Sequence, residues 1–427
     1  MTQQNTNTTD DGGIRHLSTD VAIVGAGPAG CVLAHLLARS GIEAVLIERR
    51  HDLSRDFRGY GFQPPVLRLF EDLGLLGDVL ELPHRKLQSG NIVAYDKSFE
   101  MFDWREDSDS FDFALQMDQG PLLDLLLKEA KQRDCFTYLN GTTVNDLLRQ
   151  DGSICGIEAT ERPSGDRLHV QSRLVVGADG RYSTVRDRAD IDDGRSDSDL
   201  ELLWFKLSSS PTDLETHLRI ADEGVLVYAP LNENEGQYGL FIEGGAYPEV
   251  RDRGIDHLRE RVITIEPDLE EAVWNDLDSF DDCALLDIEP GIAPVWRQDG
   301  LLLVGDAAHI ASPFGEGNVL AMHDAAKAHP DIVEALRQND GVLPKDSFAT
   351  FEQTRREAVQ KSMDSSAHMQ RLMSFVTGES NLPPSVRRTV VRTLFRTMWF
   401  VSTVTDHVPH SINGDQYVPI RTSLFVE

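Results

Sequence analysis

The chain has 427 residues, 40% hydrophobic and 26% charged, which is long enough for two or three domains with sizeable cores. This composition excludes a mainly disordered chain, a collagen-like chain and a polytopic membrane protein. Asp and Glu number 71 against 41 Lys and Arg, and the net charge of −30 argues against nucleic acid and anionic lipid as bulk partners.

The acidic residues are spread along the whole chain rather than gathered in a tail. One hypothesis is a halophilic surface suited to a high-salt cytoplasm, where screening makes self-repulsion tolerable. The alternative is an acidic protein of an ordinary cytoplasm. A melting series in KCl distinguishes the two, because only the halophilic chain should need salt for full stability.

The four cysteines, Cys31, Cys135, Cys155 and Cys283, are scattered and form no C-x-x-C pair. This pattern predicts reduced thiols in a reducing, cytoplasmic compartment. The N-terminal 18 residues are polar, without an apolar core or a basic leader, and predict a disordered arm rather than a secretion signal.

The first ordered elements form a βαβ unit: a buried strand over 21–24, a helix over about 29–39 and a strand over 44–48. Between strand and helix lies a G-x-G-x-x-G turn. Gly25 permits the tight turn, Gly27 lets the backbone approach a pyrophosphate, and Gly30 lets the helix pack closely. Glu48 ends the second strand 18 residues after Gly30, where a carboxylate can accept hydrogen bonds from a ribose. The context predicts a dinucleotide site.

Further elements follow in an order typical of an α/β protein with an inserted lobe. Helices are expected near 65–73 and 121–133, with strand-like sequence at 88–115 between them. Strands are expected at 136–139, 143–149, 154–159 and 173–178. From about 200 to 285, short strands predict an inserted, largely antiparallel sheet. A buried strand at 301–304 and a helix to about 328 follow, and the remainder is helical to about 405.

The inserted lobe is rich in aromatic residues that could line a substrate pocket. In the strand LLWFKL, alternation places Trp204 and Lys206 on one face and Phe205 on the other. Core packing is the default expectation for each aromatic residue of this lobe. These residues are Trp204, Phe205, Tyr228, Tyr238 and Phe241.

Two motifs later in the chain indicate which dinucleotide is bound. They are Gly177-Ala178-Asp179-Gly180 with the following RYSTVR, and Gly305-Asp306-Ala307-Ala308-His309 with the following IASPFGEG. With the glycine turn, they resemble the FAD-dependent aromatic hydroxylases, single-component flavoprotein monooxygenases. The resemblance covers about residues 20–360. It implies an α/β fold: a glutathione-reductase-type FAD-binding Rossmann domain with an inserted, mainly antiparallel sheet and a helical C-terminus.

The resemblance also implies roles for individual residues. Glu48 would bind the adenosine ribose, Asp306 the ribityl chain, and Asp179-Gly180 would lie where FAD meets the nicotinamide cofactor. Gln119 stands where the family usually keeps an arginine, and Asn318 stands one place earlier than the usual asparagine. The full set of implied cofactor-binding residues is Gly25, Gly27, Pro28, Ala29, Gly30, Glu48, Arg49, Arg58, Gln119, Asp179, Gly180, Asp306, Pro313, Gly315, Gly317 and Asn318.

Alternatives remain for three of these motif residues. Asp179 and Asp306 could simply cap turns or helices. His309 could act as an acid or base, but a packing role is favoured because the family motif commonly carries a histidine there. No catalytic residue and no metal site is identified, since metal-ligand patterns are absent from the sequence.

Together the patterns divide the chain into four parts. A disordered arm is expected over 1–18, and an FAD-binding domain over 19–85, 116–199 and 286–345. A substrate lobe is expected over 86–115 and 200–285, and a C-terminal helical region over 346–427.

The resemblance predicts a monooxygenase that uses FAD, NADH or NADPH, and O2 to hydroxylate an aromatic or quinone-like substrate. The alternative is a flavin-dependent reductase of isoprenoid double bonds, of the geranylgeranyl reductase type. A flavin-dependent halogenase is disfavoured because no W-x-W-x-x-P motif is present, and a non-catalytic flavoprotein is also less favoured.

The segment Arg387–Val404 stands out by its charge in an acidic chain. Arginines recur at 387, 388, 392 and 396, while Val391, Leu394, Phe395, Met398 and Trp399 can share a helical face. The favoured interpretation is a helix that packs on the FAD domain or on a second copy in a homodimer. The alternative is weak, peripheral docking on a membrane surface.

Overall fold

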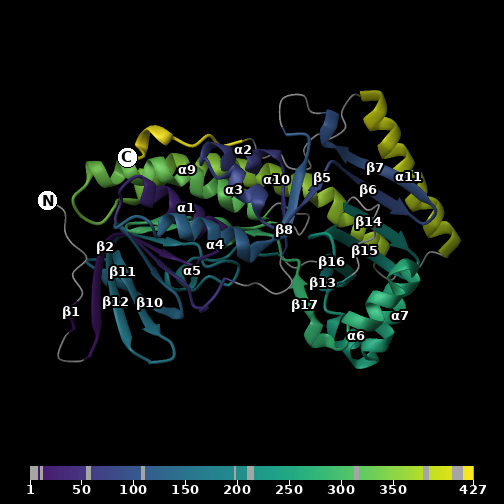
Figure 1. Ribbon diagram of the computed structural model, residues 1–427, viewed down its shortest axis with the longest axis horizontal. Helices are drawn as coiled ribbons and strands as arrows, with labels where there is room; N and C mark the ends of the chain where they lie inside the picture. The colour runs from purple at the N-terminus through teal and green to yellow at the C-terminus, as the bar shows by residue number, and fades with distance from the viewer. Residues whose placement is uncertain are drawn as a thin grey trace.

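A computed structural model describes residues 8–9, 13–53, 59–106, 111–196, 199–208, 216–311, 317–377, 384–405 and 417–426. Its two largest sheets lie toward opposite ends of the long axis (Figure 1). The strands of the first sheet are β1 (Thr8–Thr9), β2 (Arg15–Val24), β3 (Ala44–Ile47), β9 (Phe136–Leu139), β10 (Thr142–Gln150), β11 (Ser153–Glu161), β12 (Arg167–Gly177), β19 (Arg297–Gln298) and β20 (Leu301–Leu303). The strands of the second are β6 (Ser89–Ala94), β7 (Lys97–Asp103), β13 (Leu200–Leu207), β14 (Thr216–Ala221), β15 (Gly224–Pro230), β16 (Gly236–Glu243) and β17 (Cys283–Asp287).

The first sheet is built around parallel strands. β2 pairs in parallel with β3 and β12, β3 with β9, and β12 with β20. The last four residues of β2 and all of β3 are buried. Continuous apolar runs of this kind are typical of parallel strands that are covered on both faces. The carboxyl ends of β2, β3, β12 and β20 therefore meet at one edge, where ligands of such sheets bind.

Part of the segment that the sequence predicted as a polar arm belongs to the first sheet. β2 begins at Arg15, which pairs with Leu168 of β12, and Thr8–Thr9 pair with the start of β2. Residues 15–18 were expected in the arm but extend the strand, because the long strand β12 supplies backbone partners that local composition does not reveal.

Helix α1 (Pro28–Arg39) lies between α4 (Gln119–Ala130) and α9 (Gly317–Gln338) against the first sheet (Figure 1). Its residues Ala29–Ala38 are all buried, because the sheet and both neighbouring helices cover it. The remaining elements near this sheet are α2 (Pro64–Asp72), α3 (Leu76–Glu81), α5 (Thr184–Arg188), the three-stranded sheet of β4 (Gly59–Phe62), β8 (Ala114–Asp118) and β5 (Arg85–Leu87), and the pair β18 (Gly291–Ile292) and β21 (His309–Ile310).

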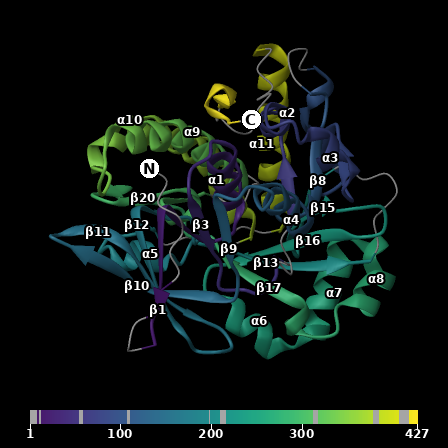
Figure 2. The same cartoon turned by 60° about the vertical axis from the view of Figure 1, so that its left-hand side comes forward.

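The second sheet is antiparallel except at one pair. Strands β6 and β7 join it through the parallel pairing of β6 with β14. Helices α7 (Ile255–Ile265) and α8 (Glu270–Asp276) pack on one face, with α6 (Tyr247–Arg253) beside them (Figure 2). Helices α10 (Ala349–Thr377) and α11 (Pro384–Thr405) pack on the opposite face. These features confirm the predicted α/β fold with an inserted, mainly antiparallel sheet.

Most aromatic residues of this sheet are core residues. Phe205, Tyr228 and Tyr238 are buried in the cluster with α7 and α8, and Phe241 is buried on the α10 face. Trp204 is partly buried on that same face. The predicted alternation along β13 is therefore correct, and packing accounts for the four fully buried rings.

Helices α6 to α8 replace part of the strand pattern that was expected between 200 and 285. Leu258, Val262 and Ile265 of α7 are buried at spacings of four and three residues, which place them on one helical face. The missed helices lie between β16 and β17 and cover the sheet that these strands help to build.

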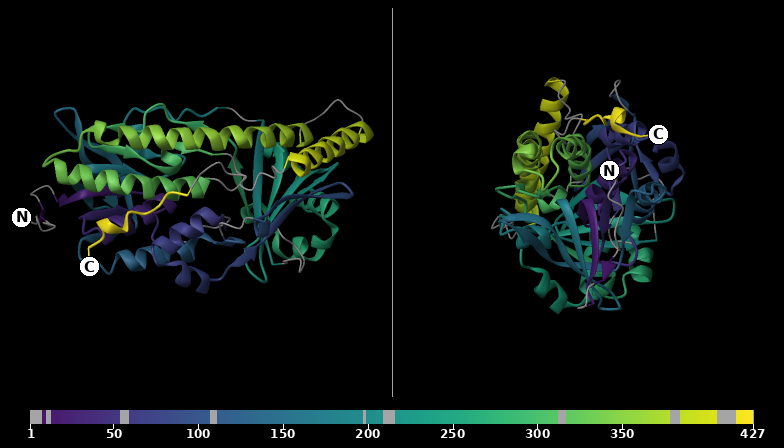
Figure 3. Two further views of the ribbon diagram at one scale, coloured as in Figure 1. Left: turned by 90° about the horizontal axis from the view of Figure 1, so that it is seen from above. Right: turned by 90° about the vertical axis from the view of Figure 1, so that its left-hand side faces the viewer.

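Helix α10 is long and extends from α9 to the second sheet (Figure 3). Helix α11 then packs on β6 and β7, where Val391 and Phe395 are buried and Phe395 stacks on Phe99 at a ring separation of 5.8 Å. None of the helices within the described ranges combines the length and the apolar character needed to cross a membrane.

The arginines of α11 pair with acidic residues of the second sheet. Arg387 donates a hydrogen bond of 2.8 Å to the Asp222 carbonyl oxygen, and Arg388 forms an ion pair with the Asp222 carboxylate. Arg392 forms an ion pair with Asp96. These contacts favour packing over membrane docking, since three of the segment's four arginines have acidic partners within the protein. The packing partner is the second sheet, however, and not the FAD domain that the sequence led us to expect.

Candidate functional site

The glycine turn between β2 and α1 depends on close backbone contacts. Gly25 has a φ of +102°, and a Cβ at this position would lie 2.4 Å from the Ala178 carbonyl oxygen. A Cβ on Gly30 would lie 1.9 Å from the Gly25 carbonyl oxygen. Both positions therefore exclude any side chain. Gly30 keeps the helix against the turn itself, and Pro28 begins the helix with its fixed φ.

Gly27 differs from its two neighbours in the motif. A Cβ at Gly27 would meet no atom of the described residues within 4 Å, so none of them covers the turn here. Gly27 is also the N-cap of α1, and no side chain caps this helix end. Free backbone N–H groups and the helix dipole make such an end suited to an anion. The turn thus fits a pyrophosphate, which could approach the backbone only where a side chain is absent.

Glu48, at the end of β3, forms a hydrogen bond with the glycine turn. Its carboxylate is buried and accepts hydrogen bonds of 3.0 Å from the Ala26 N–H and of 3.0 Å from the Arg50 N–H. Beside it lies a pocket between the ends of β2, β3 and β12 and the start of β10. The residues that line this pocket are Val24, Gly25, Ile47, Glu48, Arg49, Thr142, Thr143, Val144, Asp179, Tyr182 and Thr184.

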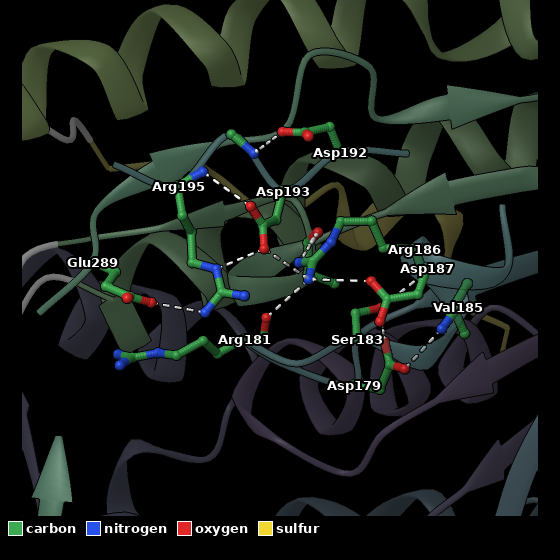
Figure 4. A network of polar contacts seen from close by, with 12 residues as sticks. Asp179, Arg181, Ser183, Val185, Arg186, Asp187, Asp192, Asp193, Arg195 and Glu289 are labelled. Carbon is green, nitrogen blue, oxygen red and sulfur yellow. Dashed lines mark hydrogen bonds and ion pairs between the residues drawn. The ribbon is translucent and has the colours of Figure 1, made fainter. Parts of the chain in front are cut away.

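Asp179 follows β12 and contributes to the N-terminal cap of helix α5, together with the N-cap residue Ser183. Its carboxylate accepts a hydrogen bond of 2.5 Å from the Ser183 hydroxyl and one of 3.1 Å from the Val185 N–H (Figure 4). Burial raises the pKa of Asp179, although these hydrogen bonds favour its ionised form. The capping role considered from the sequence is therefore present, while Asp179 also lines the pocket next to Glu48.

Arg186 connects the turn after β12 with the turn after β20. The side chain is 2% exposed and donates a hydrogen bond of 3.0 Å to the Arg181 carbonyl oxygen and one of 3.2 Å to the Ala307 carbonyl oxygen. A network of ion pairs continues beyond it through Asp193, Arg195 and Glu289, as Figure 4 shows. The two predicted Gly-Asp motifs are thus fixed relative to each other by a buried guanidinium.

Asp306 occupies a turn of 3-10 helix, Gly305–Ala307, after β20. Its carboxylate is partly exposed and makes no hydrogen bond or ion pair with another described residue. A Cβ built on Gly317, the first residue of α9, would lie 3.6 Å from the carboxylate oxygen Oδ1. Asp306 is therefore free to accept hydrogen bonds from a bound group at the start of α9.

The same turn lies against the glycine turn. A Cβ built on Gly305 would approach the Ala29 Cβ to 3.3 Å and the Ala321 Cβ to 3.1 Å. Gly305 also has a φ of +60°, a conformation that favours glycine. The Asp306 turn is consequently packed between the start of α1, which follows the glycine turn, and α9.

A buried cluster of polar side chains forms hydrogen bonds with the backbone of the Asp306 turn. Asp324 on α9 accepts hydrogen bonds of 2.8 Å from the Gly305 N–H and of 2.7 Å from His309 Nε2, and Arg355 on α10 donates one of 2.7 Å. Burial by itself would raise the pKa of Asp324, but His309 and Arg355 outweigh it and hold this pKa below its usual value. His309 is 1% exposed and packs on Trp296, which agrees with a packing role.

The remaining predicted residues lie in different surroundings. Gln119 begins α4, is 4% exposed and has no hydrogen-bond partner for its amide among the described residues. Asn318 donates a hydrogen bond of 3.4 Å to the Gly61 carbonyl oxygen, which ties α9 to β4. Gly180 has a φ of +86° beside Asp179. The predicted residues Arg58, Pro313 and Gly315 lie outside the described residues.

Sequence reasoning missed residues that position the site. Asp324 and Arg355 were given no role, because neither belongs to a turn motif and their contact joins two helices. Arg186 was quoted only as the last residue of its motif. Lys206 of β13 also reaches Asp118, the residue before Gln119, with an Nζ to Oδ1 distance of 2.7 Å. Within the described residues, no three His, Cys, Asp or Glu side chains are placed to hold a metal ion.

Comparisons with known proteins agree with this geometry. A family model for the FAD binding domain matches residues 18–366. The 6-methylpretetramide 4-monooxygenase of Streptomyces rimosus is 34% identical over 411 residues, covering 96% of each chain. A digeranylgeranylglycerophospholipid reductase of Methanocella arvoryzae is 25% identical over 387 residues, covering 84% of this chain and 88% of that protein. The solved structure of PqsL from P. aeruginosa in complex with 2-aminobenzoylacetate shares the fold, with a TM-score of 0.72 and 22% identity over 84% of this chain and 97% of that one.

Proposed function

The chain belongs to the FAD binding domain family, and we propose that it is an FAD-dependent monooxygenase that hydroxylates an aromatic or quinone-like substrate. The family match confirms the resemblance that three sequence motifs predicted. When bound, FAD supplies the redox chemistry with O2, so the protein's own contribution is to bind, orient and exclude water.

One observation carries the proposal for the cofactor. Gly27 has no described residue above its Cα and the Asp306 carboxylate has no partner among the described residues, and the turns that carry them are packed together, because Gly305 lies against Ala29 at the start of α1. An extended dinucleotide could place its pyrophosphate at Gly27 and its ribityl chain at Asp306. Glu48 would accept hydrogen bonds from the adenosine ribose, since each carboxylate oxygen can accept more than one hydrogen bond.

The start of α9 and Gln119 complete the proposed site. The N-terminus of α9 lies beside Asp306, and its dipole would stabilise negative charge on a reduced flavin ring by ~0.3–1 kcal/mol. Gln119 offers a neutral amide where the family usually presents an arginine, so we expect a hydrogen bond rather than an ion pair at this point.

The reductase alternative is supported by the relative from Methanocella arvoryzae, at 25% identity. The monooxygenase from Streptomyces rimosus is more similar, at 34% identity over 96% of both chains. We therefore propose that the substrate belongs to the chemical class of 6-methylpretetramide. We further propose NADH or NADPH as the source of electrons.

Oxygen uptake separates the candidate functions. The purified holoenzyme is mixed with NADH or NADPH, with and without 6-methylpretetramide, under 18O2. A monooxygenase should consume O2 in response to substrate and place one 18O atom in the product. A double-bond reductase should oxidise the nicotinamide without labelling any product, and a non-catalytic flavoprotein should do neither at speed. Gly27→Val protein, which we expect to lack flavin, serves as the control.

A further inference from the structure

We propose that Asp324 is a positioning residue that orients Asp306 toward the ribityl chain of FAD, an inference that depends on the proposed FAD site. Asp324 lies on α9 and would not contact the cofactor itself. It would act through the backbone of the Gly305 turn, whose next residue is Asp306.

The first step of the argument is the bond between Asp324 and the turn. The Gly305 N–H donates to Asp324 Oδ2 at 2.8 Å, and this carboxylate is fully buried. A backbone N–H bonded to a buried charge forms a stronger hydrogen bond than one bonded to water or to a neutral group. The Val304–Gly305 peptide, which leads into the turn one residue before Asp306, is thereby fixed in one orientation.

The second step is that Asp324 itself has little freedom to move. His309 Nε2 lies 2.7 Å from Oδ2 and Arg355 Nε lies 2.7 Å from Oδ1. His309 belongs to β21, just after the turn, and Arg355 belongs to α10. Three separate segments therefore converge on one carboxylate, and a buried charge of this kind is stable only because it is paired.

The third step is that the other end of the turn is also held. Arg186 donates to the Ala307 carbonyl oxygen at 3.2 Å, so backbone groups on both sides of Asp306 have buried, charged partners. The Asp306 side chain has no partner of its own among the described residues. Its direction is therefore set by the turn, which is how a cofactor-binding carboxylate can be held in place before the cofactor arrives.

A double-mutant cycle on FAD affinity tests this inference. The four apoproteins are wild type, Asp306→Asn, Asp324→Asn and the double variant, and FAD binding is measured by quenching of flavin fluorescence. We expect each single variant to raise the Kd at least tenfold. The double variant should bind FAD no more than about twofold more weakly than Asp306→Asn, because Asp324 acts through Asp306.

Two outcomes would overturn the inference. One is a Kd that Asp324→Asn leaves unchanged, and the other is a double variant in which the two single effects multiply. If wild-type apoprotein does not bind FAD, the proposed function fails instead, so the two failures are distinguishable.

The control for a general loss of stability is a buried ion pair that lies outside the proposed FAD site. Glu266 is a buried carboxylate that forms an ion pair of 2.7 Å with Arg219 in the second sheet. Glu266→Gln should lower the Tm of the apoprotein and leave the Kd for FAD unchanged. If Asp324→Asn does not fold, Arg355→Lys is the second variant. It should raise the Kd about threefold in the wild-type background and not at all in the Asp306→Asn background, and the absence of this rise would also overturn the inference.

Discussion

The backbone N–H of Ala26 donates a hydrogen bond of 3.0 Å to the carboxylate of Glu48. The glycine turn and the end of β3 are therefore joined by a bond between protein groups. The second carboxylate oxygen accepts from Arg50, so a single side chain fixes two backbone segments around the pocket.

Replacing Glu48 by Gln should weaken FAD binding. One of the two backbone N–H groups would then face an amide NH2 instead of an acceptor, at a cost of about 1–3 kcal/mol. Titration of the apoprotein with FAD and a thermal melt of the apoprotein measure both consequences. Glu43→Gln is the control, since Glu43 lies just before the same strand and is not among the residues of the pocket. An equal loss of affinity in the control would refute the role of Glu48.

Gly27 and Gly30 should respond differently to the same substitution. Gly27→Val should fold but lose FAD, because its side chain enters only the open space at the turn. Gly30→Val should fail to fold, because its Cβ would meet the Gly25 carbonyl oxygen at 1.9 Å. Circular dichroism and flavin content of the purified proteins check both results. Full flavin content in Gly27→Val would exclude the pyrophosphate site proposed here.

Substitution of the two motif aspartates should affect different properties, FAD affinity for Asp306 and protein stability for Asp179. Asp306→Ala should raise the Kd for FAD about tenfold or more, since a charged hydrogen bond contributes about 1.5–3 kcal/mol. The melting temperature of its apoprotein should change little, because Asp306 has no partner among the described residues. Asp179→Ala should instead lower the stability by about 1 kcal/mol, as expected for the loss of a helix cap. The reverse pattern in paired melts and titrations would contradict both assignments.

Two buried histidines should make the protein less stable in acid. Burial, helped by Arg39, lowers the pKa of His35 from 6.5 to about 4, and burial lowers the pKa of His329 from 6.5 to about 4. Between these values the unfolded state binds the extra protons, so the free energy of unfolding falls as the pH is lowered. His35→Leu should remove one contribution and gain about 2 kcal/mol relative to wild type between pH 7.5 and 5. Urea unfolding at both pH values measures this difference, and a constant difference would rule out a lowered pKa.

Helix α11 should be required for folding rather than for membrane binding. Phe395 is buried against Phe99, so Phe395→Ala should cost about 3 kcal/mol. Urea unfolding measures this loss. In a flotation assay with anionic vesicles, intact protein should remain in the soluble fraction, because three arginines of the helix already pair with Asp222 or Asp96. Co-flotation that disappears when the chain ends at residue 383 would support the membrane interpretation instead.

The local sequence was sufficient to predict the glycine turn. It also predicted the order of the parallel strands along the chain and the motif that follows each of them. The G-x-G-x-x-G turn needs small residues at fixed spacings, because backbone atoms approach each other within a few residues. The buried strands are recognisable because a strand covered on both faces is continuously apolar. Glu48, Asp179 and Asp306 could be found in this way, since each follows a strand directly.

Only the tertiary structure decided how these turns are held together. The bonds from Asp324 to Gly305 and from Arg186 to Ala307 join residues 19 and 121 positions apart, and β6 pairs with a strand more than 100 residues later. Contacts of this kind leave no periodic pattern in the sequence, because their partners are adjacent in space and not along the chain. The sequence by itself determined that a glycine turn and three strand-terminal carboxylates occur in this order, whereas packing between distant segments decided which of these groups have protein partners and which, such as Asp306, have none among the described residues.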